Sequence, residues 1–382
     1  MSALLLALVL LAAAAYLAGA VIVTRRFAMR RRRAAGGPRH GAAPPVSVLK
    51  PLHGLDAGLA QNLRSFADQQ YPRFQLVFGV RERTDRALPV ARALIAARPE
   101  ADIELIVDAT AAGSNRKVAN LENMLPAARH DVLVIADSDM RVTPDYLAAV
   151  TAPLGDPRTG LVTCLYKAAP VGGLWSQLAA LHINFGFLPG ALVGEALGVG
   201  GGCFGATIAL RREVFERIGG FARVRNELAD DHRMGAAVRR LGLRTVLSTY
   251  IVENQVHEPT LASLWRHELR WARTSRTMAP AGYAGSLVTH TVAISVLGAA
   301  LLGSPAAWGL VPAALALRWL SAAMIAGALG LPRRGLWLLP LRDALSFAVF
   351  VGSFCGRSVR WRGQRLRVMP SGRISVERDK PV

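Results

Sequence analysis

Pairs of acidic residues stand at three places in this sequence where carboxylates could do chemistry. Carboxylates can bind divalent cations or act as general bases, and their neighbours decide between these roles. Each pair follows a stretch whose composition predicts a β-strand, or opens a stretch that predicts a helix. The pairs are Glu82 with Asp85, Asp137 with Asp139, and Asp230 with Asp231.

The Asp137-Ser138-Asp139 sequence comes directly after the apolar run 132–136. Two carboxylates on a tight turn at the end of a buried strand supply hard oxygen ligands, which suit Mg²⁺ or Mn²⁺ bound against a diphosphate. The same residues also fit an ordinary turn with an Asx hydrogen bond, or a cap for a helix that begins near Pro144. The strand in front of them favours a metal site.

Asp230 and Asp231 open a predicted helix, and Asp231 is the candidate general base for an acceptor hydroxyl. The alternative is a pair of acids that only complements the helix dipole. Lys117 is one of four lysines in the chain and lies at another predicted helix start. From there it could point at a phosphate, or it could be a solvated side chain.

Residues 44–250 alternate short β-rich runs with helical stretches, which predicts a largely parallel sheet covered on both faces. Ligands of such sheets bind beyond the carboxyl ends of the strands, where the three acidic pairs are expected. The candidate strands are Val46–Lys50, Phe74–Val80, Ile103–Val107, Val132–Ala136, Gly160–Leu165, Ala206–Leu210 and Arg244–Ser248. The candidate helices are Asp56–Gln70, Arg86–Ala97, Arg116–Leu125, Pro144–Thr151 and Glu227–Leu241.

Two further stretches suggest contact with a membrane. Residues 258–283 predict an amphipathic interfacial helix, in which Arg270 could also be aimed at a diphosphate leaving group. Residues 168–210 contain ten glycines, and these together with Pro189 argue against a spanning helix there. This stretch predicts either a floor lying against the membrane or a plain buried core.

The chain carries 46 Lys+Arg against 26 Asp+Glu, a formal net charge of +20, yet 52% of it is hydrophobic. Many of the arginines flank apolar runs, which predicts a multi-pass membrane protein and no nucleic-acid partner. The predicted order is a transmembrane anchor (1–24), a basic linker (25–45), a catalytic domain (46–257), the interfacial helix (258–283), a C-terminal transmembrane region (284–357) and a basic tail (358–382).

The number of membrane crossings in the C-terminal transmembrane region is two or three. Runs 287–301 and 308–331 predict two crossings, and the run 336–356 is a possible third. The arginines after residue 24 predict a cytoplasmic catalytic domain, since cations favour the cytoplasmic side. A full third crossing in this region would place the arginines of the tail outside, against the same rule. Either one of the three segments does not span, or the last lies in the interface.

Taken in order, these features resemble the ceramide glucosyltransferase-like family, glycosyltransferase family 21, which includes hopanoid-associated N-acetylglucosamine transferases. The resemblance covers about residues 46–271 and implies an α/β catalytic domain of the GT-A type. Its carriers are 46–54 (VSVLKPLHG), 62–66 (NLRSF), 115–121 (NRKVANL), 137–139 (DSD), 230–231 (DD) and 267–271 (HELRW).

The resemblance implies a UDP-sugar donor, a membrane lipid acceptor and a Mg²⁺ or Mn²⁺ cofactor. Donor binding is assigned to Lys117, Asp137 and Asp230, and the metal to Asp137 and Asp139. Catalytic roles are assigned to Asp231, Arg270 and Trp271. The acidic residue for the nucleotide is Glu82 or Asp85 by strand position, or Asp102 by its spacing to the Asn-x-Lys motif. His267 stands where the family has Gln or Arg.

A single base and no second carboxylate nucleophile predict an inverting displacement without a glycosyl-enzyme intermediate. The donor sugar is N-acetylglucosamine or glucose, and the acceptor is a hopanoid polyol or a ceramide-type lipid. The Ala/Arg-rich composition suggests a bacterial inner membrane. A processive polysaccharide synthase is an alternative, although it would need more crossings. A non-enzymatic basic membrane protein that binds anionic partners is another.

Overall fold

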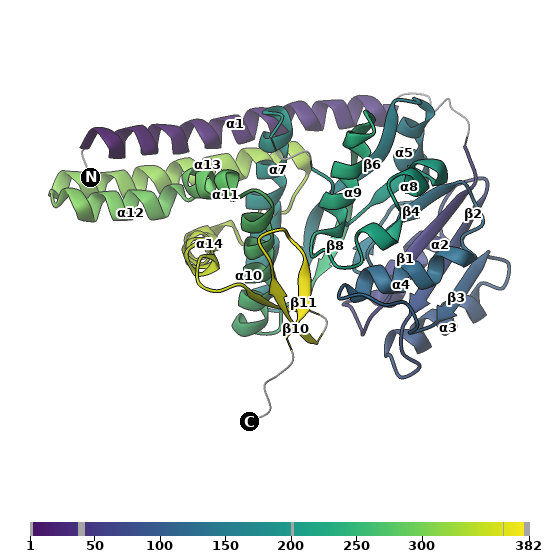
Figure 1. Ribbon diagram of the computed structural model, residues 1–382. Helices are drawn as coiled ribbons and strands as arrows, with labels where there is room; N and C mark the ends of the chain where they lie inside the picture. Colours follow the sequence, from purple (N-terminus) through teal and green to yellow (C-terminus); the bar gives the residue numbers. More distant parts are fainter. Residues whose placement is uncertain (1–2, 37–42, 200–201, 362, 378–382) are drawn as a thin grey trace. The chain divides into compact units, whose positions relative to one another are not determined.

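The computed structural model of the chain describes residues 3–36, 43–199, 202–361 and 363–377 (Figure 1). The chain divides into two compact units. The sheet unit comprises Gly36–Val171, Gly201–His257 and Arg360–Val382, and the helical unit comprises Met1–Ala35, Gly172–Gly200 and Glu258–Val359. The chain therefore leaves the sheet unit twice and returns to it twice.

An eight-stranded sheet in the order β3-β2-β1-β4-β7-β6-β8-β5 forms the centre of the sheet unit. Strands β3, β2, β1 and β4 pair in parallel, β7 runs antiparallel to β4 and β6, and β6 and β8 pair in parallel. This is the predicted α/β class with a mostly parallel core. The strands are β1 (Val46–Pro51), β2 (Phe74–Val80), β3 (Ile103–Val107), β4 (Val132–Ile135), β5 (Met140–Arg141), β6 (Thr159–Pro170), β7 (Ile208–Arg211) and β8 (Arg244–Val256).

Helices cover both faces of this sheet because successive strand residues point to opposite sides. Val48 of β1 packs into a core that includes Phe66 and Tyr146, whereas the next residue, Leu49, packs into a second core that includes Leu121 and Phe215. The helices of the first face are α2 (Leu59–Ala67), α3 (Ala87–Ala97) and α5 (Tyr146–Thr151). Those of the second are α4 (Arg116–Met124), α8 (Arg212–Arg217) and α9 (Asp230–Arg240).

All seven strands and five helices predicted for this region are present, with ends that differ by a few residues. The largest differences are β6 and β8, which extend to Pro170 and Val256 and pair over that length. The residues of the predicted basic tail also contain strands. They form a three-stranded sheet of β9 (Ser358–Trp361), β10 (Gln364–Val368) and β11 (Ile374–Val376).

The helical unit contains the long N-terminal helix α1 (Ala3–Gly36), so the helix continues through the arginines at which the sequence places a linker. In Figure 1, α1 lies beside α12 and α13, and Leu6 of α1 contacts the backbone at Gly298 of α12. The other helices of the unit are α6 (Leu174–His182), α7 (Leu188–Ala196), α10 (Leu261–Met278), α11 (Pro280–Gly285), α12 (Thr291–Leu302), α13 (Leu310–Leu329) and α14 (Leu339–Ser353).

Residues 174–196 form one helical stretch, and the expectation that its glycines and Pro189 argue against a spanning helix stays a prediction. The segment Ile183–Phe187 between α6 and α7 is a π-helix, and Pro189 follows it in the first turn of α7. About half of this stretch is buried.

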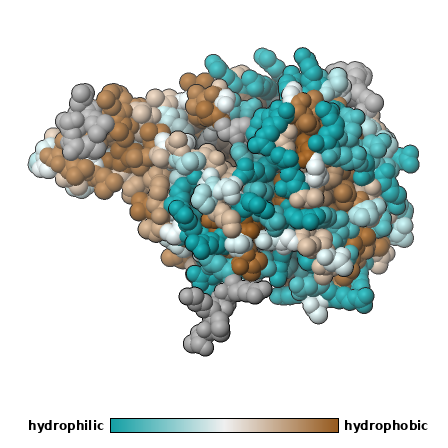
Figure 2. Space-filling view, viewed as in Figure 1, coloured by the Kyte–Doolittle hydropathy of each residue, from teal (hydrophilic) through white to brown (hydrophobic). Residues whose placement is uncertain are grey.

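Four helical stretches in the described part of the chain are long and apolar enough to cross a membrane: Leu6–Ala34, Leu174–Ala196, Pro305–Leu329 and Leu336–Ser353. The run 287–301, predicted as one crossing, is instead broken near His290, where Pro280–Thr289 and Thr291–Leu302 meet at 74°. Figure 2 shows apolar residues gathered over α1, α12 and α13.

Two of the charges that interrupt the apolar helices pair with each other. Arg318 of α13 donates through Nε to both carboxylate oxygens of Asp343 of α14, at 3.3 and 3.0 Å. This pair supplies the partner that a buried arginine in a membrane helix requires. Arg342, the neighbour of Asp343, pairs instead with Glu268 of α10.

Candidate functional site

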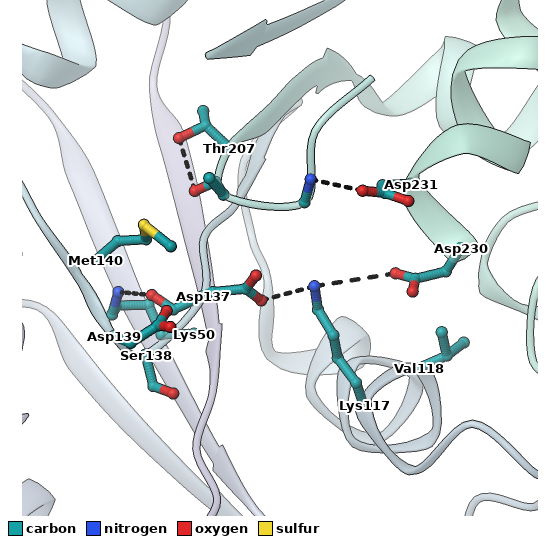
Figure 3. A network of polar contacts seen from close by, with 12 residues as sticks. Lys50, Lys117, Val118, Asp137, Ser138, Asp139, Met140, Thr207, Asp230 and Asp231 are labelled. Atoms are coloured by element: carbon teal, nitrogen blue, oxygen red, sulfur yellow. Dashed lines mark hydrogen bonds and ion pairs between the residues drawn. The ribbon is translucent and has the colours of Figure 1, made fainter. Parts of the chain in front are cut away.

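Lys117 joins two of the three acidic pairs at the carboxyl edge of the sheet (Figure 3). Its Nζ lies 2.6 Å from Oδ1 of Asp137, which follows β4, and 4.0 Å from Oδ2 of Asp230 at the start of α9. Burial acts to lower the pKa of Lys117, but the carboxylates of Asp137 and Asp230 outweigh it and raise that pKa above its ordinary value. Lys117 is therefore a fixed cation, and the solvated alternative is not observed.

Asn115 places Lys117 by capping α4. Its Oδ1 accepts hydrogen bonds from the backbone N–H of Lys117 and Val118, at 3.0 and 3.1 Å. Its Nδ2 donates to Oδ1 of Asp230 at 3.3 Å, so one side chain fixes the starts of both α4 and α9. The positive end of the α4 dipole and the charge of Lys117 favour an anionic group beside this cluster.

Asp231 is held by backbone donors. Oδ2 accepts from the N–H of Gly205 at 2.8 Å, and Oδ1 accepts from the N–H of His232 at 2.7 Å. Burial and the neighbouring Asp230 raise the pKa of Asp231 to about 6, against the opposing effects of Lys117 and the two N–H donors. A carboxylate with a pKa near 6 is a stronger base than an ordinary aspartate yet is ionised at neutral pH.

The two aspartates of the D-S-D turn have different surroundings. Asp137 faces Lys117, whereas Asp139 is buried and its Oδ2 accepts from Nδ2 of Asn254 at 2.8 Å. Oδ1 of Asp139 is buried without a hydrogen-bond partner among the described residues. Burial, together with the charges of Asp137 and Asp56, raises the pKa of Asp139 to about 7.

These observations fit a divalent cation bound at the D-S-D turn. An unpartnered buried carboxylate oxygen is a ready ligand, and a cation would favour its ionised form. No group of three or more His, Cys, Asp or Glu side chains that could hold a metal occurs in the described ranges. A site with one or two protein carboxylates, completed by phosphate oxygens, is typical of Mg²⁺.

Lys50 is a component of the site that the sequence analysis did not identify. It lies fully buried on β1, its Nζ donates to the carbonyl of Asp137 at 2.8 Å, and it lies 3.5 Å from the centre of the Phe66 ring. Burial lowers its pKa to about 7, although Asp137, Asp139 and Asp56 act in the opposite direction. Lys50 thus holds the backbone of the D-S-D turn in place. The sequence feature that could have indicated this role is a lysine inside an otherwise apolar strand.

Glu82 and Asp85 line a recess at the ends of β1 and β2, with His53, Arg81 and Arg116 around them. Oδ1 of Asp85 accepts from the N–H groups of Gly54 and Ala87, both at 2.8 Å, and Oδ2 lies 3.1 Å from Nδ1 of His53. Asp85 therefore fixes the loops of the recess, while Glu82 is exposed at its rim.

Asp102 lies at the opposite edge of the sheet. It precedes β3, so it stands at the amino end of the strand, and its carboxylate pairs with Arg129 at 2.5 Å on the surface. Asp102 is therefore separated from the other site residues, which lie at the carboxyl edge of the sheet.

Arg270 and Trp271 belong to α10, in the helical unit. Helix α10 begins with a capping box of Thr260 and Ser263. His267, which departs from the family motif, pairs through Nδ1 with Oε1 of Glu258 at 2.6 Å, and its ring meets that of Trp271 edge-on at 4.4 Å between centres. The structure thus brings Lys117, Asp137, Asp230 and Asp231 together in the sheet unit, and holds the HELRW residues as a separate group.

A sequence model of glycosyltransferase family 21 matches residues 5–374. Ceramide glucosyltransferase 1 of Caenorhabditis elegans is 28% identical over 238 residues, which cover 62% of this chain and 51% of that protein. Ceramide glucosyltransferase of Komagataella phaffii is 33% identical over 101 residues, covering 25% and 20%. The chain thus spans about half, or less, of the length of these curated relatives.

Among solved structures, a mannosyltransferase of Pyrobaculum calidifontis, in complex with GDP-Man and Mn²⁺, superimposes with a TM-score of 0.47 at 20% identity, over 91% of this chain and 99% of that one. We draw no inference from a likeness of this size. The family match, by contrast, extends over nearly the whole sequence and includes every site residue described above. The chain belongs to glycosyltransferase family 21.

Proposed function

We propose that the chain transfers one sugar, N-acetylglucosamine or glucose, from a UDP-sugar to a hydroxyl group of a membrane lipid of the hopanoid polyol or ceramide type. The observation that carries this proposal is the cluster of Lys117, Asp137, Asp230 and Asp231 at the carboxyl edge of the sheet. The family membership of the chain and the names of its relatives support a glycolipid product.

The donor diphosphate is expected beside Lys117 and the start of α4, where a fixed cation and the positive end of the helix dipole favour negative charge. Asp137 and Asp139 would hold a Mg²⁺ or Mn²⁺ ion, which when bound supplies a Lewis acid for the leaving diphosphate. Glu82, at the rim of the adjacent recess, is the proposed contact for the nucleoside. Arg270 and Trp271 are the proposed contacts for the leaving group from the helical unit.

Asp231 is the proposed general base. Departure of UDP develops positive charge at the anomeric carbon, and the acceptor oxygen becomes a better nucleophile when its proton moves to a carboxylate. Fixed by the N–H groups of Gly205 and His232, Asp231 accepts that proton without a change of position. A single displacement by this route predicts inversion at the anomeric carbon.

Membrane sidedness follows from charge. The arginines between Arg25 and Arg33 come directly after the apolar part of α1, which favours a cytoplasmic position for the catalytic domain in a bacterial inner membrane. UDP-sugars would then reach the site from the cytoplasm, and the lipid acceptor from the bilayer.

The test is to incubate the purified protein with UDP-glucose and UDP-N-acetylglucosamine and a panel of ceramides, hopanoid polyols and diacylglycerols, with Mg²⁺ or Mn²⁺, and to measure product masses. We expect one sugar per lipid, in the inverted configuration. The Asp231→Asn variant should lose at least about 100-fold in kcat, as is typical for loss of a general base. A polymeric product, a retained configuration or full activity of Asp231→Asn would refute the proposal.

A further inference from the structure

The chain returns to the sheet unit after the helical unit and there contacts the segment in front of the acidic pair of α9. The N–H of Ile374 in β11 donates to the carbonyl of Asn226 at 2.8 Å, and the N–H of Leu228 donates to the carbonyl of Gly372 at 3.2 Å. Glu227 and Arg373 form an antiparallel bridge between these two bonds. Segment 226–228 therefore pairs with the C-terminal residues as a short strand would.

A side chain of α9 strengthens this contact. Arg233 donates to the carbonyl of Ser371 through Nη2, and its Nε donates to Oε2 of Glu227 at 3.1 Å. Arg233 lies within one turn of Asp230 and Asp231. The C-terminal hairpin of β10 and β11 is therefore bonded both to α9 and to the segment that leads into α9.

The same segment is tied on its other side to the start of α4. The N–H of Asn115 donates to the carbonyl of Arg225 at 2.9 Å, and Nδ2 of Asn115 donates to the carbonyl of Glu227 at 2.8 Å. Gly113 allows this approach: a Cβ there would lie 2.7 Å from the carbonyl oxygen of Arg225, and its φ of +119° also favours glycine.

We propose that β11 is a positioning element of the catalytic site. It fixes segment 225–228 against the α4 start, and through that segment it sets where Asp231 and Lys117 stand relative to each other. This inference rests on the proposed function for its effect on turnover, but the docking of β11 is a statement about the fold alone. The N–H of Ile374 bonds to a backbone carbonyl of this segment and not to a carboxylate of the site, so the role of β11 differs from that of a catalytic residue.

The docking of β11 also constrains the membrane topology. Because residues on both sides of the helical unit's segment 258–359 belong to one folded unit, both ends of that segment lie on the same side of a membrane. Only an even number of its helices can cross. The stretch Leu174–Ala196 follows β6 and precedes β7 of the same sheet, so both of its ends also lie on one side of a membrane. It therefore cannot be a single crossing.

Replacing Ile374 by Pro tests the positioning role, because it removes the N–H that bonds to Asn226. We expect kcat to fall at least about tenfold with the KM for the UDP-sugar changed less than about threefold, since a misplaced base mainly affects the transition state. The matched control, Ile374→Val, keeps the N–H and should retain the wild-type kcat. A folded Ile374→Pro enzyme with wild-type kcat would overturn the inference.

Arg233→Ala is a second variant for the case in which Ile374→Pro does not fold, because Arg233 is only half-buried. It should lower kcat by about threefold or more, in the same direction and without a matching change in KM. A chain ending at Met369 lacks β11, and a chain ending at Glu377 keeps it. Only the shorter chain should lose activity, and equal activity of the two would count against the role of β11.

Two measurements need no catalytic activity. In hydrogen exchange on the membrane-embedded full chain and on the chain ending at Met369, the Leu228 amide should exchange at least about tenfold faster in the shortened chain. In sealed vesicles, a protease site inserted after Glu377 and one placed in loop 108–113 should be cleaved from the same side. Unchanged Leu228 exchange, or cleavage from opposite sides, would refute the docking even if no sugar transfer were detected.

Discussion

At the scale of single residues, the site depends on a balance of charges around Asp231. Burial and the negative charge of Asp230 favour the protonated form of Asp231, and Lys117 favours the ionised form. The net result, a pKa of about 6, places its titration in an accessible range. The balance also ties the proton acceptor to the residues proposed to hold the donor diphosphate.

A first prediction concerns pH. Because a base acts only when deprotonated, kcat/KM should fall about tenfold per pH unit below about pH 6 and level off above it. Replacing Asp230 by Asn removes a like charge, which lowers the pKa of Asp231, so the acidic limb should move to lower pH. The measurement is a pH–rate profile of each enzyme. A limb that stays in place in the Asp230→Asn variant would exclude Asp231 as the titrating group.

A second prediction concerns Gly205. A Cβ at this position would lie 3.2 Å from Nζ of Lys117, 3.3 Å from Oδ2 of Asp231 and 3.6 Å from Oδ2 of Asp137. The methyl group of Gly205→Ala would therefore occupy the space between the charged groups. We expect kcat/KM to fall at least about tenfold, because small displacements of catalytic groups are costly.

The control for Gly205 is Gly155→Ala, where a Cβ would meet no atom within 4 Å. Both variants should melt within about 4 °C of the wild type, the shift that roughly 1 kcal/mol produces in a chain of this size. A parallel loss of activity in the two variants would show that the effect is not specific to the site.

The residue types of the site could be predicted from the sequence, but their supports could not. Asp137, Asp231 and Lys117 stand out because charged residues follow or precede regular apolar runs. Lys50 donates to the carbonyl of Asp137, and the N–H of Gly205 donates to the carboxylate of Asp231. Both partners are distant in sequence, so no local pattern indicates them. Asp102 shows the same limit, since its spacing to a motif gave no information on the sheet edge at which it lies.

At the scale of elements, helix α10 is anchored by a buried ion pair. Nη1 and Nη2 of Arg342 lie 2.6 and 2.7 Å from the two carboxylate oxygens of Glu268, and the side chains are 1% and 5% exposed. Glu268 lies between His267 and the Arg270-Trp271 pair of the HELRW motif. The Arg342–Glu268 ion pair therefore fixes the rotation of α10, the helix that carries these residues.

Replacing one partner of the Arg342–Glu268 pair should destabilise the fold more than replacing both partners. Glu268→Ala leaves the Arg342 charge buried without its partner, which costs about 3–5 kcal/mol, whereas the double variant Glu268→Leu with Arg342→Leu should recover most of that loss. Unfolding in detergent measures both. As a surface control, Glu100→Ala removes an exposed partner of Arg98, which is worth about 1 kcal/mol at most. Equal loss in the single and double variants would contradict this account.

The elements themselves were largely predictable, with informative exceptions. Strands β1, β2 and β4 are fully or almost fully buried, and their apolar runs indicate this directly. The strands of the C-terminal hairpin were missed because their arginines suggested a solvated tail. Yet residues 365–368 alternate exposed arginines with the buried Leu366 and Val368, a period of two that is typical of a half-buried strand.

At the scale of the whole molecule, charge and apolar surface are distributed as in a membrane protein. Groups of arginines follow the apolar part of α1 and helix α13, a distribution that is typical of membrane helices. Exposed apolar side chains also occur beyond the long helices: Leu197 and Val199, after α7, are 69% and 60% exposed. We interpret these two residues as a contact with lipid.

Leu197→Asp tests this interpretation. A charge at an exposed lipid contact should lower turnover of the lipid acceptor at least about tenfold, while hydrolysis of the UDP-sugar by water should change less than about twofold, because Leu197 is not among the residues proposed to bind the donor. Leu197→Met keeps the apolar contact and serves as the control. Both rates are measured on the same vesicle preparation. Equal losses in transfer and hydrolysis would remove the case for a lipid contact.

The pairing of Arg233 with Ser371 joins positions 138 residues apart, with the whole segment 258–359 between them. During synthesis, the acidic pair of α9 leaves the ribosome long before its partner strand exists, and the late apolar helices must enter the bilayer in between. Under the proposed role of β11, the catalytic site is therefore complete only after the last apolar helices have been synthesised. Sugar transfer would then report on the assembly of the whole chain.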